Sequence, residues 1–101
     1  MNAKFLEQLV RENVELMKEK NSDYSGSRGD NITRTGLYGV AVRLADKVER
    51  LLNLTDPANG KAPNFESIHD TFRDISNYGL IGQMLEAGQW GPESTWKKEE
   101  P

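Results

Sequence analysis

Hydrophobic side chains recur at spacings of three and four residues in three stretches of the chain, and this spacing is typical of one face of an α-helix. The first stretch, residues 3–20, carries Phe5, Leu6, Leu9, Val10, Leu16 and Met17. The second, residues 36–54, carries Leu37, Val40, Ala41, Leu44, Val48, Leu51 and Leu52. The third, residues 64–87, carries Phe65, Ile68, Phe72, Ile75, Tyr78, Ile81 and Leu85. Since no segment reads as a strand, the pattern predicts three amphipathic helices and an all-α fold.

The segments between these stretches contain residues that favour turns. Residues 21–35 are polar and rich in Ser, Asn, Asp and Gly, so we predict a loop there, longer than most connections in compact domains. Residues 55–63 contain two prolines and an Asn-Gly pair, which predicts a turn. Asn64 is the predicted N-cap of the third helix, with Glu66 at its positive end. Gly88 is predicted to end that helix, and residues 93–101 form a polar tail.

The length and composition of the chain set limits on its fold. A single domain is predicted over residues 1–92 of the 101, and a core of that size buries only about 60 to 70 per cent of the surface of the unfolded chain. The chain has no cysteine, so disulfides cannot stabilise it. We therefore expect an antiparallel bundle of three to four helices, completed by homo-oligomerisation.

Charge and hydropathy exclude some classes of protein. The 13 basic and 16 acidic residues give a net charge of -3, which argues against general nucleic-acid binding through many phosphate contacts. Residues 1–13 carry charges within their apolar pattern, so they are predicted to be neither a signal peptide nor a membrane span. The expected location is the cytoplasm, which for a viral protein is the cytoplasm of the host cell. No membrane partner is expected.

Two helices carry stripes of charged residues. Along the second helix, Gly39, Arg43, Asp46, Arg50 and Asn53 advance by four, three, four and three residues, with Lys47 beside them; we call this set the basic stripe. Along the third helix, Glu66, Asp70 and Asp74 advance by four and four, and Asn77 follows; the three carboxylates are the acidic stripe. Like charges at this spacing repel by a few tenths of a kcal/mol per pair, so we expect something to offset the repulsion.

Two interpretations of the stripes are open. In the first, the cations of one helix neutralise the carboxylates of the next in a ladder of ion pairs. In the second, the carboxylates hold Mg²⁺, which prefers oxygen ligands and keeps several waters, while the cations contact the phosphates of a ligand. A binding site without its ligand often pairs its own charges, so both can hold in part.

The order of three segments along the chain is further evidence about function. These segments are Lys20–Tyr24, Arg43–Leu54 and Glu66–Tyr78. In this order they resemble a phage family known as the nucleotide-modification-associated domain, over about residues 17–82. That family looks related to the MazG-like all-α nucleoside triphosphate pyrophosphatases, in which acidic residues of two helices hold Mg²⁺ over the phosphates and a water attacks. Those enzymes carry a Glu-Glu-x-x-Glu signature where this chain has Asp46 and Glu49 among three cations, so binding is better supported than hydrolysis.

The resemblance implies roles for individual residues. The catalytic or water-orienting carboxylates would be Asp46, Glu66, Asp70 and Asp74, of which Glu66, Asp70 and Asp74 would be the metal ligands. The phosphate-binding cations would be Lys20, Arg43, Lys47 and Arg50. Asp23 and Tyr24 would contact the base or sugar, and Asn77 and Tyr78 would complete the pocket.

Three functions are compatible with these features. The first is a phage-type nucleotide-binding protein that acts with Mg²⁺ as a nucleoside triphosphate pyrophosphohydrolase in nucleotide metabolism. The second is a viral sponge that sequesters a nucleotide immune signal without chemistry. The third is a helical interaction module in which the stripes are structural.

Overall fold

The structure of the protein, a computed structural model, describes residues 1–24 and 31–91, with residues 22–24 described by their backbone only. Within these ranges the chain forms the helices α1 (Ala3–Tyr24), α2 (Asn31–Thr55) and α3 (Phe65–Glu86), a short 3₁₀ helix η1 (Pro57–Asn59), and no strand. The predicted all-α class is therefore confirmed. The chain divides into two units, residues 1–30 and 31–101, which are described separately, and the single domain over residues 1–92 stays a prediction.

Helix α1 is longer than its predicted range of 3–20. It begins after Asn2, whose side-chain Oδ1 accepts a hydrogen bond from the amide of Phe5 at 3.0 Å, and it continues to Tyr24. The prediction that a loop begins at residue 21 is therefore wrong. Asn, Ser and Asp cost a helix only a few tenths of a kcal/mol each, and no glycine or proline interrupts this stretch before Gly26.

Helix α2 also begins earlier than predicted, at Asn31, but it is kinked at Gly36. The φ and ψ angles of Gly36 are 66° and -153°, a combination that is essentially restricted to glycine. The regular part of α2 therefore follows Gly36, close to the predicted start. Residues 31–35 form a first turn of their own, whereas the sequence had predicted a loop there, and residues 25–30 lie outside the described part of the chain.

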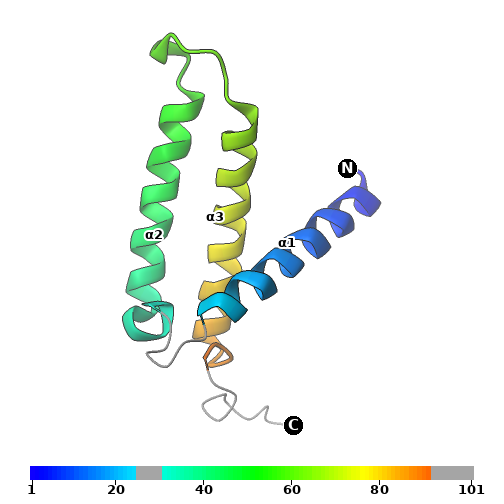
Figure 1. Cartoon of the computed structure of the whole chain (residues 1–101), viewed down its shortest axis with the longest axis vertical. Helices are drawn as coiled ribbons and strands as arrows, with labels where there is room; N and C mark the ends of the chain where they lie inside the picture. The colour runs from blue at the N-terminus through cyan, green and yellow to red at the C-terminus, as the bar shows by residue number, and fades with distance from the viewer. Residues whose placement is uncertain (25–30, 92–101) are drawn as a thin grey trace. The chain divides into compact units, whose positions relative to one another are not determined.

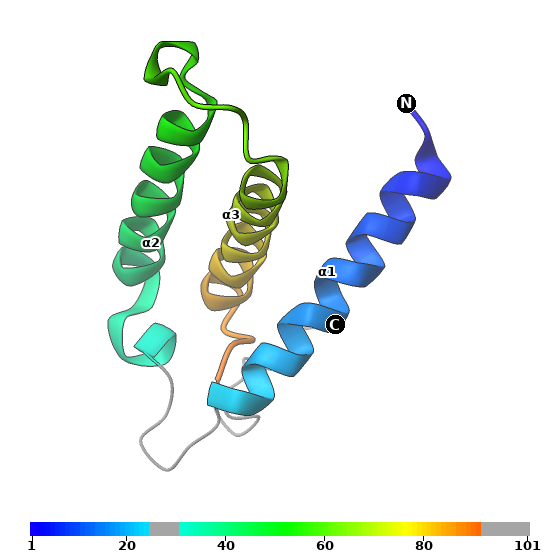
Figure 2. The same cartoon turned by 45° about the horizontal axis from the view of Figure 1, so that its top comes forward.

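Helices α2 and α3 run antiparallel and lie side by side, joined by the segment that contains η1 (Figures 1 and 2). Asn64 caps α3 as predicted, because its Oδ1 accepts from the amide of Ser67 at 3.1 Å. At the other end Gly88 has a φ of 70°, its amide donates to Leu85, and the next amide donates to Met84. This pair of bonds is a Schellman motif, so Gly88 ends the helix as predicted.

The hydrophobic core of the α2–α3 hairpin is small. Among the described residues, the buried hydrophobic side chains are Ile32, Val40 and Ile81. A Cβ atom at Gly82 would lie 3.9 Å from Val40 Cγ1, so this glycine marks an ordinary contact between the two helices. Phe65 and Phe72, which the sequence places on the apolar face of α3, are 74% and 55% exposed. These two side chains are therefore not part of the α2–α3 core, whereas Ile81, which the sequence places on the same face, is buried. None of the described helices combines the length and apolar character that crossing a membrane requires.

Candidate functional site

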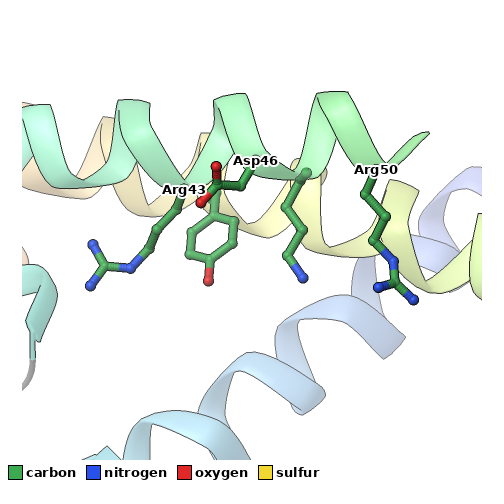
Figure 3. Close-up of a pocket in the computed structure, with 5 residues that line it drawn as sticks. Arg43, Asp46 and Arg50 are labelled. Carbon is green, nitrogen blue, oxygen red and sulfur yellow. The ribbon is translucent and has the colours of Figure 1, made fainter. Parts of the chain in front are cut away.

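The basic stripe of α2 forms one side of an open hollow of about 370 Å³. Five residues line this hollow: Arg43, Asp46, Lys47 and Arg50 of α2 and Tyr78 of α3. All five were candidate site residues in the sequence. Arg43 and Arg50 extend from the same side of α2, with Asp46 between them along the helix (Figure 3). The spacings of four and three residues along a helix place these side chains on one face, and α3 adds the aromatic ring.

Lys47 joins the basic stripe to the acidic stripe. Its Nζ atom lies 3.0 Å from Asp74 Oδ2, and the two side chains are 32% and 25% exposed. The pair therefore lies at the edge of the α2–α3 contact rather than in the interior. Exposed ion pairs contribute about 0.2 to 1 kcal/mol, so this pair can open without a large loss of stability.

Neither arginine of the hollow pairs with a carboxylate among the residues that the structure describes. Arg43 donates from Nη1 to the hydroxyl of Thr35 at 3.3 Å. Arg50 is exposed and makes no such bond within the described residues, and Asp46 is also exposed. The ladder of ion pairs predicted from the stripes thus has one described rung, Lys47–Asp74, and the two guanidinium groups remain accessible to a ligand.

The rest of the acidic stripe lies outside the hollow. Glu66 and Asp70 are exposed and do not line it. Residues shift in opposite directions along two antiparallel helices, so each step from Asp74 towards the start of α3 corresponds to a step from Lys47 towards the end of α2. Glu66 therefore lies near the level of Thr55, beyond the hollow. Asp70 lies near the level of Leu51, next to Arg50, but its exposed side chain does not line the hollow.

The remaining predicted residues are not gathered at the hollow. Asn77 is buried and does not line it, and its Oδ1 has no hydrogen-bond partner among the described residues. Lys20 is an exposed residue of α1, which belongs to the other unit. The side chains of Asp23 and Tyr24 lie outside the described part of the chain.

The carboxylates do not form a cluster that resembles a metal site. Within residues 1–21 and 31–91, whose side chains are described, no three Asp, Glu or His side chains converge where they could hold a metal ion. Mg²⁺ is often bound through only one or two protein carboxylates, with waters and substrate phosphates as its other ligands. In the hollow itself, Asp46 is the carboxylate that could take that role, together with Asp74 if Lys47 moved away.

Thr35 is a residue of the site that the sequence analysis did not include. Thr35, Gly39 and Arg43 follow one another at intervals of four residues, so Thr35 extends the spacing of the basic stripe by one turn. The four-residue spacing alone does not identify Thr35, because Gly36 interrupts the helix between Thr35 and Gly39.

No protein-family model matches the chain, and no curated protein or solved structure matches it either.

Proposed function

We propose that the protein binds a nucleotide through its phosphates, in the hollow between the basic stripe of α2 and Tyr78 of α3. The observation that supports this most directly is the composition of the hollow, in which three cations of one helix lie beside one aromatic ring and one carboxylate. Since Asp74 already pairs with Lys47, the two arginines contribute most of the positive charge open to a ligand. A hollow with this lining selects an anion that also carries a planar ring.

The spacing of the cations favours a chain of phosphates over a single phosphate. Seven residues of α-helix separate Arg43 from Arg50, which corresponds to about 10 Å along the axis, and Lys47 lies between them. Each guanidinium can donate two parallel hydrogen bonds to phosphate oxygens, whereas an ammonium acts as a point charge. A polyphosphate lying along α2 would meet the three cations in turn.

Tyr78 gives the hollow a surface for a base. Aromatic rings stack on nucleobases with about 1 to 3 kcal/mol per base and with little preference among them. Tyr78 is partly buried and lines the hollow, so the accessible part of its side chain is open to a ligand there. The proposal therefore predicts nucleotide binding with a modest contribution from base identity.

Hydrolysis with Mg²⁺ is the second candidate function, and the position of Asp46 in the hollow favours it. In that case one or two carboxylates would hold the hydrated ion. Water would attack the α-phosphorus of a nucleoside triphosphate, and cleavage of the bond to the α–β bridging oxygen would release pyrophosphate and leave a nucleoside monophosphate. Sequestration of a nucleotide signal by a viral protein needs only the binding step. The two candidates differ in whether the bound nucleotide is recovered unchanged.

Calorimetric titration of the purified protein tests the proposal directly. The eight common ribo- and deoxyribonucleoside triphosphates and inorganic triphosphate would each be titrated with and without Mg²⁺, and we expect saturable binding of at least one. Heat denaturation of the complex and chromatography of the released ligand then separate the two candidates, since an intact nucleotide indicates sequestration and a shortened one indicates hydrolysis. Absence of binding throughout would contradict both.

We further propose that the protein self-associates through the outer face of α2. Tyr38, Ala41, Ala45, Val48 and Leu52 advance by three, four, three and four residues, the spacing of a coiled-coil seam. All five are exposed, Tyr38 and Leu52 by 81% and 64%. Sedimentation velocity over a range of concentrations would detect an oligomer, which Leu52→Lys should weaken. A monomer at every concentration would contradict the proposal.

A further inference from the structure

The start of α2 has a backbone arrangement that brings Thr35 over the regular part of the helix. Gly36 adopts a φ of 66° and a ψ of -153°, so the turn formed by residues 31–35 does not continue along the helix axis. Thr35 thereby comes very close to Gly39, which is buried. A Cβ atom at Gly39 would lie 1.9 Å from Thr35 Oγ1 and 2.4 Å from Thr35 Cβ.

These distances require a glycine at position 39. Rotation of the Thr35 side chain can move its hydroxyl, but it cannot move Cβ, which is bonded directly to the backbone. Any side chain at position 39 would therefore displace the backbone of the 31–35 turn. At Gly79, a helical glycine of α3, a Cβ atom would meet nothing within 4 Å, so the close approach at Gly39 is a local feature of α2.

The hydroxyl of Thr35 is oriented by its two hydrogen bonds. It donates its single hydrogen to the carbonyl oxygen of Asn31 at 2.6 Å. Only its lone pairs are then left for Arg43, whose Nη1 atom donates to it at 3.3 Å. Thr35 thus acts as a fixed acceptor for one edge of the guanidinium and leaves the other donors of Arg43 for a ligand.

We infer that Thr35 is a positioning residue for Arg43, and that Gly39 provides the space in which Thr35 reaches it. The inference rests on the proposed function, in which Arg43 contacts phosphate. An arginine side chain loses much rotamer freedom when a ligand immobilises it. A guanidinium already held by Thr35 loses less, so binding is tighter. Arg50, which has no such acceptor among the described residues, contributes without this advantage.

Two substitutions of Thr35 test the inference. Thr35→Val keeps the shape of the side chain and removes the hydroxyl, and with it the acceptor for Arg43. We expect the affinity for inorganic triphosphate to fall about threefold to tenfold, because binding must then immobilise one more flexible side chain. Thr35→Ser keeps the hydroxyl and should bind within twofold of the unaltered protein. In an Arg43→Ala background, Thr35→Val should cause no further loss. Equal losses with and without Arg43, or no loss in the presence of Arg43, would overturn the inference.

A measurement without ligand separates this inference from the proposed function. The Nε–Hε resonance of Arg43 in the ¹⁵N spectrum should shift in Thr35→Val and keep its position in Thr35→Ser. If the unaltered protein binds neither the nucleoside triphosphates nor inorganic triphosphate, the proposed function fails. The spectra still decide whether Thr35 holds Arg43. An unchanged resonance in Thr35→Val would refute the positioning role even where binding is observed.

Gly39→Ala with Gly79→Ala as its matched control tests the role of the glycine. Gly39→Ala should move the Arg43 resonance and weaken triphosphate binding at least as much as Thr35→Val, whereas Gly79→Ala should do neither. A Gly39→Ala protein that folds, keeps the resonance and binds normally would contradict the role of Gly39. If it does not fold, the Thr35 variants still decide the inference.

Discussion

The basic stripe of α2 and the acidic stripe of α3 look alike in the sequence, since both place charged residues at intervals of three or four along a helix. In the structure, three cations of the basic stripe line one hollow, whereas the acidic stripe contributes only Asp74, through its pair with Lys47. Glu66 and Asp70 are left in solvent. Helical spacing thus determines which residues share a face, but the packing of one helix against the other determines which of them reach a common site.

This difference implies that the basic stripe carries the binding energy. The largest effect should come from the double variant Arg43→Ala, Arg50→Ala, because charge-assisted hydrogen bonds contribute about 1.5 to 3 kcal/mol each. We expect the affinity for the best-bound nucleotide to fall about 100-fold or more in calorimetric titrations. The free energy of unfolding should change by less than about 0.5 kcal/mol, since both side chains reach solvent.

The same double variant distinguishes a binding site from a structural module. If the stripes only stabilise the helices, the variant would unfold at a lower denaturant concentration and ligand affinity would be irrelevant. A clear loss of stability combined with unchanged nucleotide affinity would therefore favour the interaction-module hypothesis. Glu66→Gln, Asp70→Asn serves as the control, because it alters two charges that lie outside the hollow.

The next effect concerns Asp74, where the two interpretations of the acidic stripe predict opposite results. If Asp74 competes with phosphate for Lys47, Asp74→Asn should release the lysine and tighten triphosphate binding by up to about fivefold, because the ligand no longer has to break an ion pair of about 0.2 to 1 kcal/mol. If Asp74 is a metal ligand, the same change should weaken Mg²⁺-dependent binding. Titrations of this variant with and without Mg²⁺ measure the sign directly.

The sequence predicted the elements of this fold better than their boundaries. The three helices, the Asn64 cap and the Gly88 end follow from local patterns, and the structure has them. Residues 21–24 and 31–35 are helical where the sequence predicts a loop, because their polar residues favour turns only weakly, and the described break within α2 is at Gly36. Local preferences of a few tenths of a kcal/mol do not decide where a helix ends.

The sequence predicts only the part of the candidate site that lies on a single helix. Arg43, Asp46, Lys47 and Arg50 belong to one helix, so their common face follows from their spacing. The Lys47–Asp74 pair and the position of Tyr78 depend on how α3 lies against α2, which spacing alone does not give. The same limit applies to Phe65 and Phe72, which their spacing assigns to the apolar face of α3 although both are exposed. Periodicity does not identify which neighbour an apolar face packs against.

A smaller effect is expected for the Lys47–Asp74 pair itself. Both side chains are about a quarter to a third exposed. The coupling free energy between Lys47 and Asp74 should therefore be about 0.2 to 1 kcal/mol, within the range of exposed ion pairs. A double-mutant cycle with Lys47→Met and Asp74→Asn, measured by urea denaturation, isolates this term from the other interactions of each residue. A coupling of several kcal/mol would show that the pair is structural and is not readily opened by a ligand.

The smallest effect is expected for Asp70→Asn, in the part of the acidic stripe that lies outside the hollow. Asp70 lies four residues from both Glu66 and Asp74, and like charges at this spacing destabilise a helix by a few tenths of a kcal/mol. Removing its charge should therefore raise the free energy of unfolding by about that amount at low ionic strength, and the gain should vanish in high salt because salt screens exposed charges. Nucleotide affinity should stay unchanged. A loss of Mg²⁺-dependent binding or turnover would instead show that Asp70 takes part in a metal site, and the two stripes would then act as one.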